Sequence, residues 1–344
     1  MYQVQKCDCE NRYNIVPCCE LQLFLCLAVC KIRLIEVGWN GRQVHGLKQR
    51  MAVGSEFGLQ PMIALPSAQD DGLYFEDEVG AWVEDKYRLV SLYETLFSTG
   101  MKHKWERRVY IDLFSGPGLV RVRGMNKFAW SSPFLALQVK DPFDKYIFCE
   151  SNVTALNALR ERVDKYFPHA NVSYVSGDCN DKVAEICNKI PAPSAGNKVL
   201  SFCFVDPYDL SVKFSTVKKI SERFVDFLIL LALGMDANRN QQHYLDPKNQ
   251  KIDEFVGLAE WRKEWKDQSS KNKISLPKFL AETYAKQMQT LQYLPVAFHQ
   301  MKPVRSDVKN LPLYHLALFS RHNLAYTYWE DVLKYSTSQL PLGI

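Results

Sequence analysis

Short apolar runs alternate with polar, helix-like stretches through most of this chain. The runs are rich in β-branched and aromatic residues and are bounded by Gly, Pro, Asp or Asn, which is typical of buried strands. Seven strands are predicted, at residues 109–113, 145–149, 171–176, 199–205, 225–233, 291–301 and 313–320. The last two are expected to close the sheet as an antiparallel pair. This alternation favours an α/β fold with one large, mostly parallel sheet.

Helical periodicity marks three other regions. Residues 81–97 repeat apolar positions at helical spacing, so a helix is expected to pack one face on the sheet. After the fifth strand the chain is polar and helix-prone, with Trp261 and Trp265 one turn apart, which predicts a helical insertion at about residues 236–288. A last helix is expected around Trp329.

Changes in residue composition divide the chain into an extension, a domain and a tail. Residues 1–68 are predicted to be a Cys-rich extension that is poorly ordered or outside the core, residues 69–335 the domain, and residues 336–344 a tail. Six of the ten cysteines fall in the first thirty residues, at spacings that match neither a zinc finger nor a ferredoxin. No metal site is therefore expected.

Composition narrows the function classes. The chain is 47% hydrophobic and carries a formal charge of +5, which excludes a disordered protein and permits a nucleic-acid partner without requiring one. The apolar run 21–30 is ten residues long, whereas a membrane span needs about 20. Acidic residues precede the run and no clear cleavage site follows, so it is a poor signal peptide. A cytoplasmic protein without a membrane partner is expected.

The stretch 112–118 (DLFSGPG) carries the first chemical signal. An apolar run leads into it, and two glycines allow the backbone to approach a ligand closely after the first strand. Its spacing fits neither the dinucleotide fingerprint nor the P-loop, so S-adenosylmethionine is the better match. The residues of this turn predicted to bind the cofactor are Asp112, Phe114, Ser115, Gly116 and Gly118.

Each of the first four predicted strands leads to an acid. Glu150 is predicted to accept the ribose hydroxyls of the cofactor, Asp178 to bind its adenine amino group, and Asp206 to serve the acceptor. Open α/β sheets bind ligands at the carboxyl ends of their strands. Two alternatives exist: the acids cap the following helices, or they hold a metal as in a nuclease. Strands about 4.8 Å apart disperse four strand ends too widely for one cation.

Asp206, Pro207 and Tyr208 follow the fourth strand and are the predicted catalytic residues. Methyl transfer depends mainly on positioning, so Asp206 is expected to hydrogen-bond an acceptor amine and Tyr208 to stack on its ring. A base in a duplex would have to be flipped to reach this site. The alternative for Tyr208 is an aromatic residue packed under the helical insertion. Weaker candidates near the same edge are Asp236, Arg239 and His243.

Residues 119–131 form too long a connection for a tight turn between strand and helix. The segment is expected either to bind substrate, by gripping phosphate and stacking a base, or to act as a lid that excludes water. The predicted substrate-binding residues are Arg121, Arg123, Phe128 and Trp130. The basic run 102–108 is expected to be a solvated face.

Taken together, these motifs resemble the three-Cys-motif partner family of bacteria and phages, over residues 73–335. The matching pieces are the helix with Lys86, KWERR, YIDLFSGPG, SSPFLAL, DKYIFCE, FVDPY, GMDANRN and LYHLALFSRH. The resemblance implies a Rossmann-like, seven-stranded class I methyltransferase-type sheet with a helical insertion. It also implies that S-adenosylmethionine binds with help from Lys86, and that the partner is a three-Cys-motif protein similar to radical-SAM proteins.

The resemblance leaves the activity open. Amino-methyltransferases of nucleic acids carry two prolines after the acidic residue, whereas this chain has a single one at Pro207. The turn that presents the acceptor is therefore expected to differ in shape. A S-adenosylmethionine-dependent methyltransferase that acts on a planar amine such as a nucleic-acid base is the first hypothesis. A non-catalytic nucleotide-binding subunit of a radical-SAM-like partner is the alternative.

Overall fold

The computed structural model describes residues 65–125, 127–306 and 310–336. Residues 1–64 of the predicted Cys-rich extension and nearly all of the predicted tail lie outside the described residues, so the boundaries proposed for them stay predictions.

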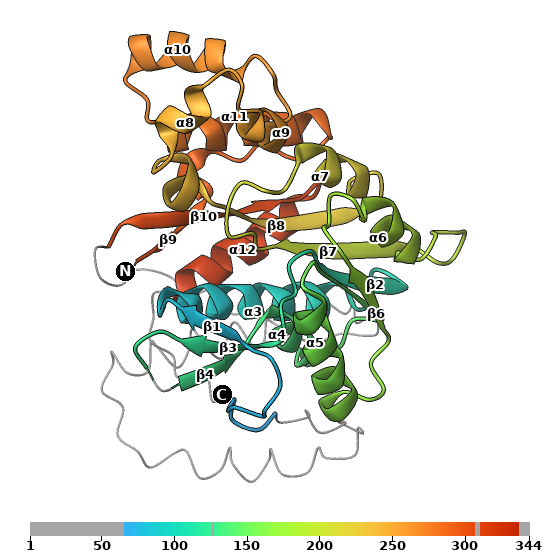
Figure 1. Cartoon of the computed structure of the whole chain (residues 1–344). Helices are drawn as coiled ribbons and strands as arrows, with labels where there is room; N and C mark the ends of the chain where they lie inside the picture. The colour runs from blue at the N-terminus through green and yellow to red at the C-terminus, as the bar shows by residue number, and fades with distance from the viewer. Residues whose placement is uncertain (1–64, 126, 307–309, 337–344) are drawn as a thin grey trace, which may run out of the picture. The chain divides into compact units, whose positions relative to one another are not determined.

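A seven-stranded sheet organises the described chain (Figure 1). Its strands, in spatial order, are β6 (Val172–Ser176), β5 (Lys145–Glu150), β2 (Arg107–Asp112), β7 (Val199–Val205), β8 (Val225–Leu231), β10 (Pro312–Phe319) and β9 (Lys302–Arg305). All adjacent pairs from β6 to β8 are parallel, while β10 is antiparallel to both β8 and β9. This order, with one reversed strand near the edge, is that of the class I methyltransferase sheet. The predicted fold class is confirmed.

Helices cover both faces of the sheet, which explains why a strand such as β7 (VLSFCFV) is buried along its whole length. The described helices are α3 (Trp82–Met101), α4 (Ser132–Leu137), α5 (Val153–Tyr166), α6 (Val183–Lys189), α7 (Phe214–Ile220), the π-helix η1 (Leu233–Ala237), α8 (Gln241–Leu245), α9 (Lys251–Val256), α10 (Trp261–Asn272), α11 (Leu276–Thr290), the 3-10 turn η2 (Phe298–Gln300) and α12 (Asn323–Ser336). Of these, α10 lies away from the sheet, at the top of Figure 1. None of these described helices is long and apolar enough to span a membrane.

Aromatic side chains join the helices to the sheet. On one face, Tyr93 of α3 lies between Phe202 of β7 and Trp329 of α12, with ring centroids 5.3 and 5.8 Å away. On the other face, Tyr284 of α11 contacts Phe214 of α7 and Phe319 of β10. Such contacts bury the face of α3 that the helical periodicity predicted to pack on the sheet, and they also bury a face of α11.

The sixth strand lies elsewhere than predicted. Residues 291–301 form an irregular segment with one 3-10 turn, and the edge strand β9 begins only at Lys302. Tyr293 and Val296 are nonetheless buried, and the hydroxyl of Tyr293 donates to the carbonyl of Val225 at 2.8 Å. An apolar run that is buried without pairing cannot be distinguished from a strand by pattern alone.

The segment 119–131, predicted to be a long connection that binds substrate or acts as a lid, contains a β-hairpin. β3 (Leu119–Val122) pairs with β4 (Lys127–Trp130), and β3 also pairs in parallel with β1 (Glu76–Val79) in a separate three-stranded sheet. Gly124, with φ of +70°, lies between the two strands of the hairpin. The strands have only four residues each, so their alternation was too short to indicate a sheet.

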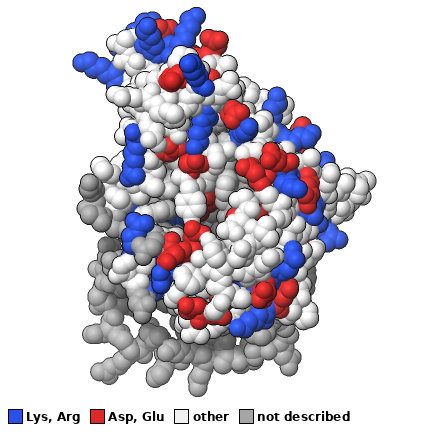
Figure 2. Space-filling view, viewed as in Figure 1, with Lys and Arg blue, Asp and Glu red and all other residues white. Residues whose placement is uncertain are grey.

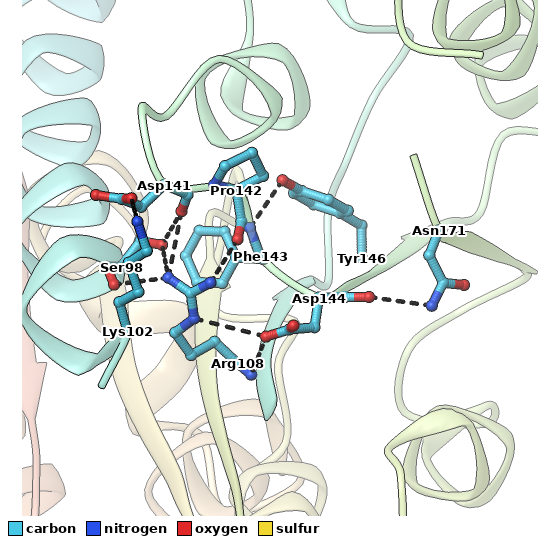
Figure 3. Close-up of polar contacts among 9 residues, drawn as sticks. All are labelled: Ser98, Lys102, Arg108, Asp141, Pro142, Phe143, Asp144, Tyr146 and Asn171. Carbon is cyan, nitrogen blue, oxygen red and sulfur yellow. Dashed lines mark hydrogen bonds and ion pairs between the residues drawn. The ribbon is translucent and has the colours of Figure 1, made fainter. Parts of the chain in front are cut away.

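The basic run 102–108 is only partly solvated, because Arg108 at the start of β2 is buried (Figure 3). Its guanidinium group donates to the carbonyl oxygens of Ser98 and Pro142, each at 2.8 Å. Its backbone N–H donates to Asp144 at 2.7 Å. These bonds join the end of α3, the start of β2 and the loop before β5 at the amino-terminal edge of the sheet.

Candidate active site

The strand-end acids share one edge of the sheet. Asp112 ends β2, Glu150 ends β5, and Asp178 and Asp206 follow β6 and β7 by one or two residues. These four strands are parallel neighbours, so their carboxyl ends lie side by side. The chain leaves β2 toward β5 and β6, then returns to the other side of β2 at β7. The edge between β2 and β7 is therefore the topological switch point, where open α/β sheets bind ligands.

The glycine turn after β2 is fastened to the end of β5. Gly116 N–H donates to Oε2 of Glu150 at 2.9 Å, and both the N–H and the hydroxyl of Ser115 donate to the carbonyl of Cys149. Gly116 and Gly118 have φ values of +58° and +86°, a conformation that favours glycine. The turn is thus held in one shape by the carboxylate predicted to bind ribose.

The two glycines have different surroundings. A Cβ atom on Gly118 would lie 2.6 Å from the ring of Phe134, whereas a Cβ atom on Gly116 would meet no heavy atom within 4 Å. Gly118 therefore allows α4 to pack closely, and Gly116 borders open space. Phe114, also predicted to bind the cofactor, is half-buried in the same turn. An open backbone beside a fixed carboxylate is what a cofactor with a ribose needs.

Glu150 keeps unused hydrogen-bonding capacity. Its Oε1 accepts from the backbone N–H of Asn152 at 2.8 Å and from the Ser151 hydroxyl at 3.3 Å, while Oε2 accepts from Gly116. An ionised carboxylate offers about four lone-pair positions. The bonds orient the group and leave at least one position, so Glu150 fits the role of a ribose ligand.

Asp178 is exposed and accepts a hydrogen bond from the backbone N–H of Asn180 at 2.7 Å. This bond closes a local turn before α6 and does not cap that helix, whose N-cap residue is Lys182 without a side-chain cap. Asn180 in turn accepts from the hydroxyl of Thr216 at 2.7 Å, so the turn after β6 is tied to α7. The role of Asp178 toward adenine stays a prediction.

Asp112 is completely buried. Burial raises the pKa of its carboxyl group to about 7, and the charges of Asp206 and Glu150 act in the same direction, against hydrogen bonds from Ser132 and Phe114. The backbone N–H of Phe114 donates to Oδ1 at 3.1 Å. Asp112 therefore fixes the start of the glycine turn through this hydrogen bond. The carboxyl group of Asp112 gains or loses its charge near neutral pH.

Lys86 and Asp206 form a buried ion pair between α3 and the end of β7. The Nζ atom of Lys86 lies 2.5 Å from Oδ2 of Asp206, and their side chains are 4% and 14% exposed. The ammonium group also lies over the rings of Trp82 and Tyr87, at 5.2 and 4.7 Å from their centroids. The structure thus joins the lysine predicted to bind the cofactor to the aspartate predicted to orient the acceptor.

Tyr208 projects from the end of β7 and is 64% exposed, so it is not packed in the core as the alternative required, whereas Pro207 beside it is buried. Its hydroxyl interacts with the carboxyl group of Glu76. Partial desolvation of the hydroxyl, together with the charges of Glu76 and Asp206, raises the pKa of Tyr208. An exposed ring with a tethered hydroxyl end is suited to stacking on a planar substrate.

Two residues of this edge were not found from the sequence. Burial, with the charges of Glu150 and Asp77, raises the pKa of Glu76 despite the hydrogen bond from Tyr208. Burial, with the charges of Asp206 and Tyr208 foremost, also raises the pKa of Tyr87. Glu76 comes from a four-residue strand and Tyr87 from the second turn of α3, and neither lies in a short sequence motif.

The edge has an acidic character. In addition to burial, the charge of Glu150 raises the pKa of both Glu76 and Asp112. The charge of Asp206 also raises the pKa of Asp112. Lys86 is the cation paired with Asp206. In the face shown in Figure 2, acidic side chains gather around the middle of the view, whereas basic ones are prominent on the helical insertion at the top. The described residues contain no group of His, Cys, Asp and Glu placed to hold a metal ion. The field favours a ligand that carries positive charge.

Of the predicted substrate-binding residues, Arg121, Phe128 and Trp130 lie in strands of the small sheet, and Arg123 lies in the hairpin turn between β3 and β4. Arg121 forms two hydrogen bonds with Asp77, at 2.7 and 2.5 Å, and Arg123 is exposed. Phe128 meets Phe75 edge-to-face at 5.1 Å; Trp130 stacks on Phe134 at 4.6 Å. Contacts within the protein therefore involve Arg121, Phe128 and Trp130, and the role of all four residues toward substrate stays a prediction.

Of the weaker candidates, Asp236 has a clear structural position. Its carboxylate accepts from the hydroxyl of Tyr244 at 2.5 Å and from the backbone N–H of Leu210 at 3.1 Å. Burial acts to raise its pKa, but these hydrogen bonds outweigh it and the pKa is lowered. Asp236 thus ties the helical insertion to the loop that follows Tyr208. Arg239 and His243 lie on the same insertion.

No family model matches the chain, and no curated protein is significantly similar to it in sequence. Among solved structures, it is similar to Trm1 from Pyrococcus horikoshii in complex with S-adenosyl-L-methionine, with 8% identity over 72% of this chain and 57% of that one and a TM-score of 0.36. It is also similar to the O-methyltransferase TomG from Streptomyces achromogenes, with 11% identity over 54% and 73% and a TM-score of 0.30. At such values these structures add nothing to the assignment of individual residues.

Proposed function

We propose that this protein is a S-adenosylmethionine-dependent methyltransferase that acts on a planar amine such as a nucleic-acid base. The observation that carries the proposal is the construction of the switch-point edge. There, Glu150 holds the glycine turn at Gly116, and the Lys86–Asp206 pair lies on the other side of β2. One half of the edge is suited to the cofactor and the other half to the acceptor.

The cofactor would be held by residues at the ends of β2 and β5. Glu150 would accept the ribose hydroxyls, and the open backbone at Gly116 would allow close approach. The cofactor supplies an electrophilic methyl group on a positively charged sulfur, and the carboxylates of this edge suit that charge. The carboxylate of Glu150 and the backbone at Gly116 fit the cofactor, and hydrogen bonds within the protein already orient both.

The acceptor would be positioned by the residues after β7. Lys86 binds Oδ2 of Asp206, which leaves Oδ1 to accept a hydrogen bond from the amine and turn its lone pair toward the cofactor side. Tyr208, with its hydroxyl held by Glu76, would stack on the ring that carries the amine. Positioning of this kind needs no metal ion and no protein nucleophile.

The finer assignment to the three-Cys-motif partner family is part of the proposal. Its support is that four of the matching sequence motifs meet around this edge: the helix with Lys86, FVDPY, LYHLALFSRH and GMDANRN. Lys86 contacts Asp206, Trp82 packs on Tyr314 of the LYHLALFSRH segment at 5.1 Å, and Asp236 of GMDANRN binds Leu210. A radical-SAM-like partner protein is expected on the same ground.

Isothermal titration calorimetry with S-adenosylmethionine and S-adenosylhomocysteine tests the cofactor half. We expect both to bind, and Glu150→Ala to weaken binding by roughly 1 to 3 kcal/mol through lost hydrogen bonds to a charged group. Glu161→Ala, which removes an exposed carboxylate from α5, is the matched control and should bind like wild type. Binding of NAD or ATP without binding of either sulfur ligand would refute the proposal.

Transfer of a labelled methyl group to nucleic acid and to the partner protein tests the acceptor half. Asp206→Asn and Tyr208→Ala are expected to lose most methyl transfer while their cofactor affinity stays within a few-fold of wild type. If wild type binds the cofactor but methylates no acceptor, the non-catalytic subunit is favoured instead.

A further inference from the structure

A groove runs between α3 and the edge strand β9, with a volume of about 420 Å³. α3 packs against β9 along this line, and the groove is walled by Trp82, Lys86 and Leu89 on the helix and by Lys302 and Arg305 on the strand. We call it the α3–β9 groove. Its volume falls within the range of pockets that hold small ligands.

The walls of the α3–β9 groove are basic. Four of its lining side chains, Lys86, Arg88, Lys302 and Arg305, are cations, and Asp85 is an anion. Lys86 is paired with Asp206, and Arg88 lies 3.2 Å from Asp85. Lys302 and Arg305 form no ion pair with the carboxylates that the structure describes. The groove therefore keeps two positive charges that an anion can neutralise.

The groove adjoins the acceptor half of the candidate site. Lys86 lines the groove and also binds Asp206, so one side chain forms the boundary between the two. β9 is the edge strand on the side of β7, β8 and β10, opposite the side on which β5 and β6 carry the predicted cofactor residues. A molecule that presents an amine to Asp206 can thus extend into the groove without meeting the cofactor.

We propose that the α3–β9 groove binds phosphate groups of the methyl acceptor, so that the acceptor is a nucleotide or a single-stranded nucleic acid. This inference rests on the proposed function and adds the substrate class. The acidic edge attracts a cation, whereas the groove attracts an anion, which separates the two ligands by charge. Trp82, in the groove wall, offers an aromatic surface next to the cations, a combination used to bind single strands.

Fluorescence anisotropy with a labelled single-stranded oligonucleotide of about 12 nucleotides tests the proposal. Lys302→Glu with Arg305→Glu is expected to weaken binding at least tenfold in low salt. For single strands, the slope of log K against log salt is about −0.7 per neutralised phosphate. Lys302→Ala with Arg305→Ala removes two cations, so the slope should become less steep by roughly 1.4. Lys302→Arg with Arg305→Lys keeps the charge and should keep the affinity.

The matched control is Lys140→Ala with Arg107→Ala, which removes one exposed lysine and one exposed arginine near the amino-terminal edge of the sheet. It should bind the oligonucleotide like wild type. Competition by a nucleoside monophosphate but not by the nucleoside would show that a single nucleotide is enough for binding. Competition only by oligonucleotides would show that the acceptor is a single-stranded nucleic acid. Equal competition by the uncharged nucleoside would overturn the inference.

The two proposals fail separately. Lys140→Ala with Arg107→Ala is compared with Lys302→Ala with Arg305→Ala. If both lower the oligonucleotide affinity equally, or if neither changes it, the α3–β9 groove is not the phosphate site, whatever calorimetry shows for the cofactor. If wild type binds no S-adenosylmethionine while oligonucleotide binding still depends on Lys302 and Arg305, the proposed function is refuted and the phosphate site stands.

Discussion

The Nζ atom of Lys86 lies 2.5 Å from Oδ2 of Asp206, although 120 residues separate the two in the chain. Lys86 comes from the second turn of α3 and Asp206 from the end of β7, so the pair joins a helix to the switch-point edge of the sheet. Each charge is buried and depends on the other. Removal of one partner leaves an uncompensated charge, which costs more than the pair contributes.

Loss of Lys86 alone should therefore destabilise the protein strongly. We expect Lys86→Met to lower the free energy of unfolding by about 3 to 5 kcal/mol, and Lys86→Met with Asp206→Leu to lower it much less. Urea unfolding at neutral pH measures both. Lys334→Met, which breaks an exposed pair with Asp331, should cost less than about 1 kcal/mol. Equal losses for Lys86→Met and Lys334→Met would show that the buried pair is not formed in solution.

The two glycines of the turn should respond differently to alanine. Gly118→Ala places a Cβ atom 2.6 Å from Phe134 in addition to the strain of a positive φ, so we expect a loss of several kcal/mol in stability. Gly116→Ala brings only the strain, about 1 kcal/mol, because no atom lies within 4 Å. Thermal unfolding measures the loss of stability, and calorimetry measures the loss of cofactor affinity. For Gly116→Ala, the loss in binding free energy should exceed the loss in the free energy of unfolding. An unaffected affinity would place the cofactor away from this turn.

Asp112 should make stability depend on pH. Burial raises its folded-state pKa to about 7, so the folded protein holds a proton that the unfolded chain releases near pH 4. The contribution of Asp112 to the free energy of unfolding is fully present below about pH 4. It falls as the pH rises and is lost above about pH 7. Asp112→Asn should thus be more stable than wild type at pH 8, by up to about 4 kcal/mol, and similar at pH 4. Asp164→Asn, at an exposed position, serves as the control. A constant difference across this range would contradict the prediction.

Two buried arginines, at the carboxyl and amino-terminal edges of the large sheet, allow effects on cofactor binding to be compared with effects on stability. Arg162 of α5 binds Asp71 at 2.6 Å and the carbonyl of Pro117 at 2.7 Å, so it supports the glycine turn from behind. Arg108 makes an equally dense set of bonds at the amino-terminal edge (Figure 3). We expect Arg162→Leu and Arg108→Leu each to cost about 3 to 5 kcal/mol of stability. Calorimetry on the folded variants should show weaker cofactor binding for Arg162→Leu alone.

Local sequence was enough to predict the sheet and one edge of the site. Buried parallel strands need continuous apolar runs, and the runs at 145–149 and 199–205 match β5 and β7 closely. Once those strands are parallel, the residues that follow them must share an edge. The neighbourhood of Asp112, Glu150 and Asp206 therefore followed from the order of runs, turns and acids alone.

Tertiary structure alone decided the partners of those residues. The pairing of Lys86 with Asp206, the contact of Glu76 with Tyr208 and the charge of the α3–β9 groove each join segments that are distant in the chain. No local period or spacing encodes such contacts, because they depend on which helix face and which edge strand pack together. β9 illustrates the same limit: burial at 291–301 comes from packing against the core, whereas pairing begins at Lys302, where β10 lies alongside as a partner.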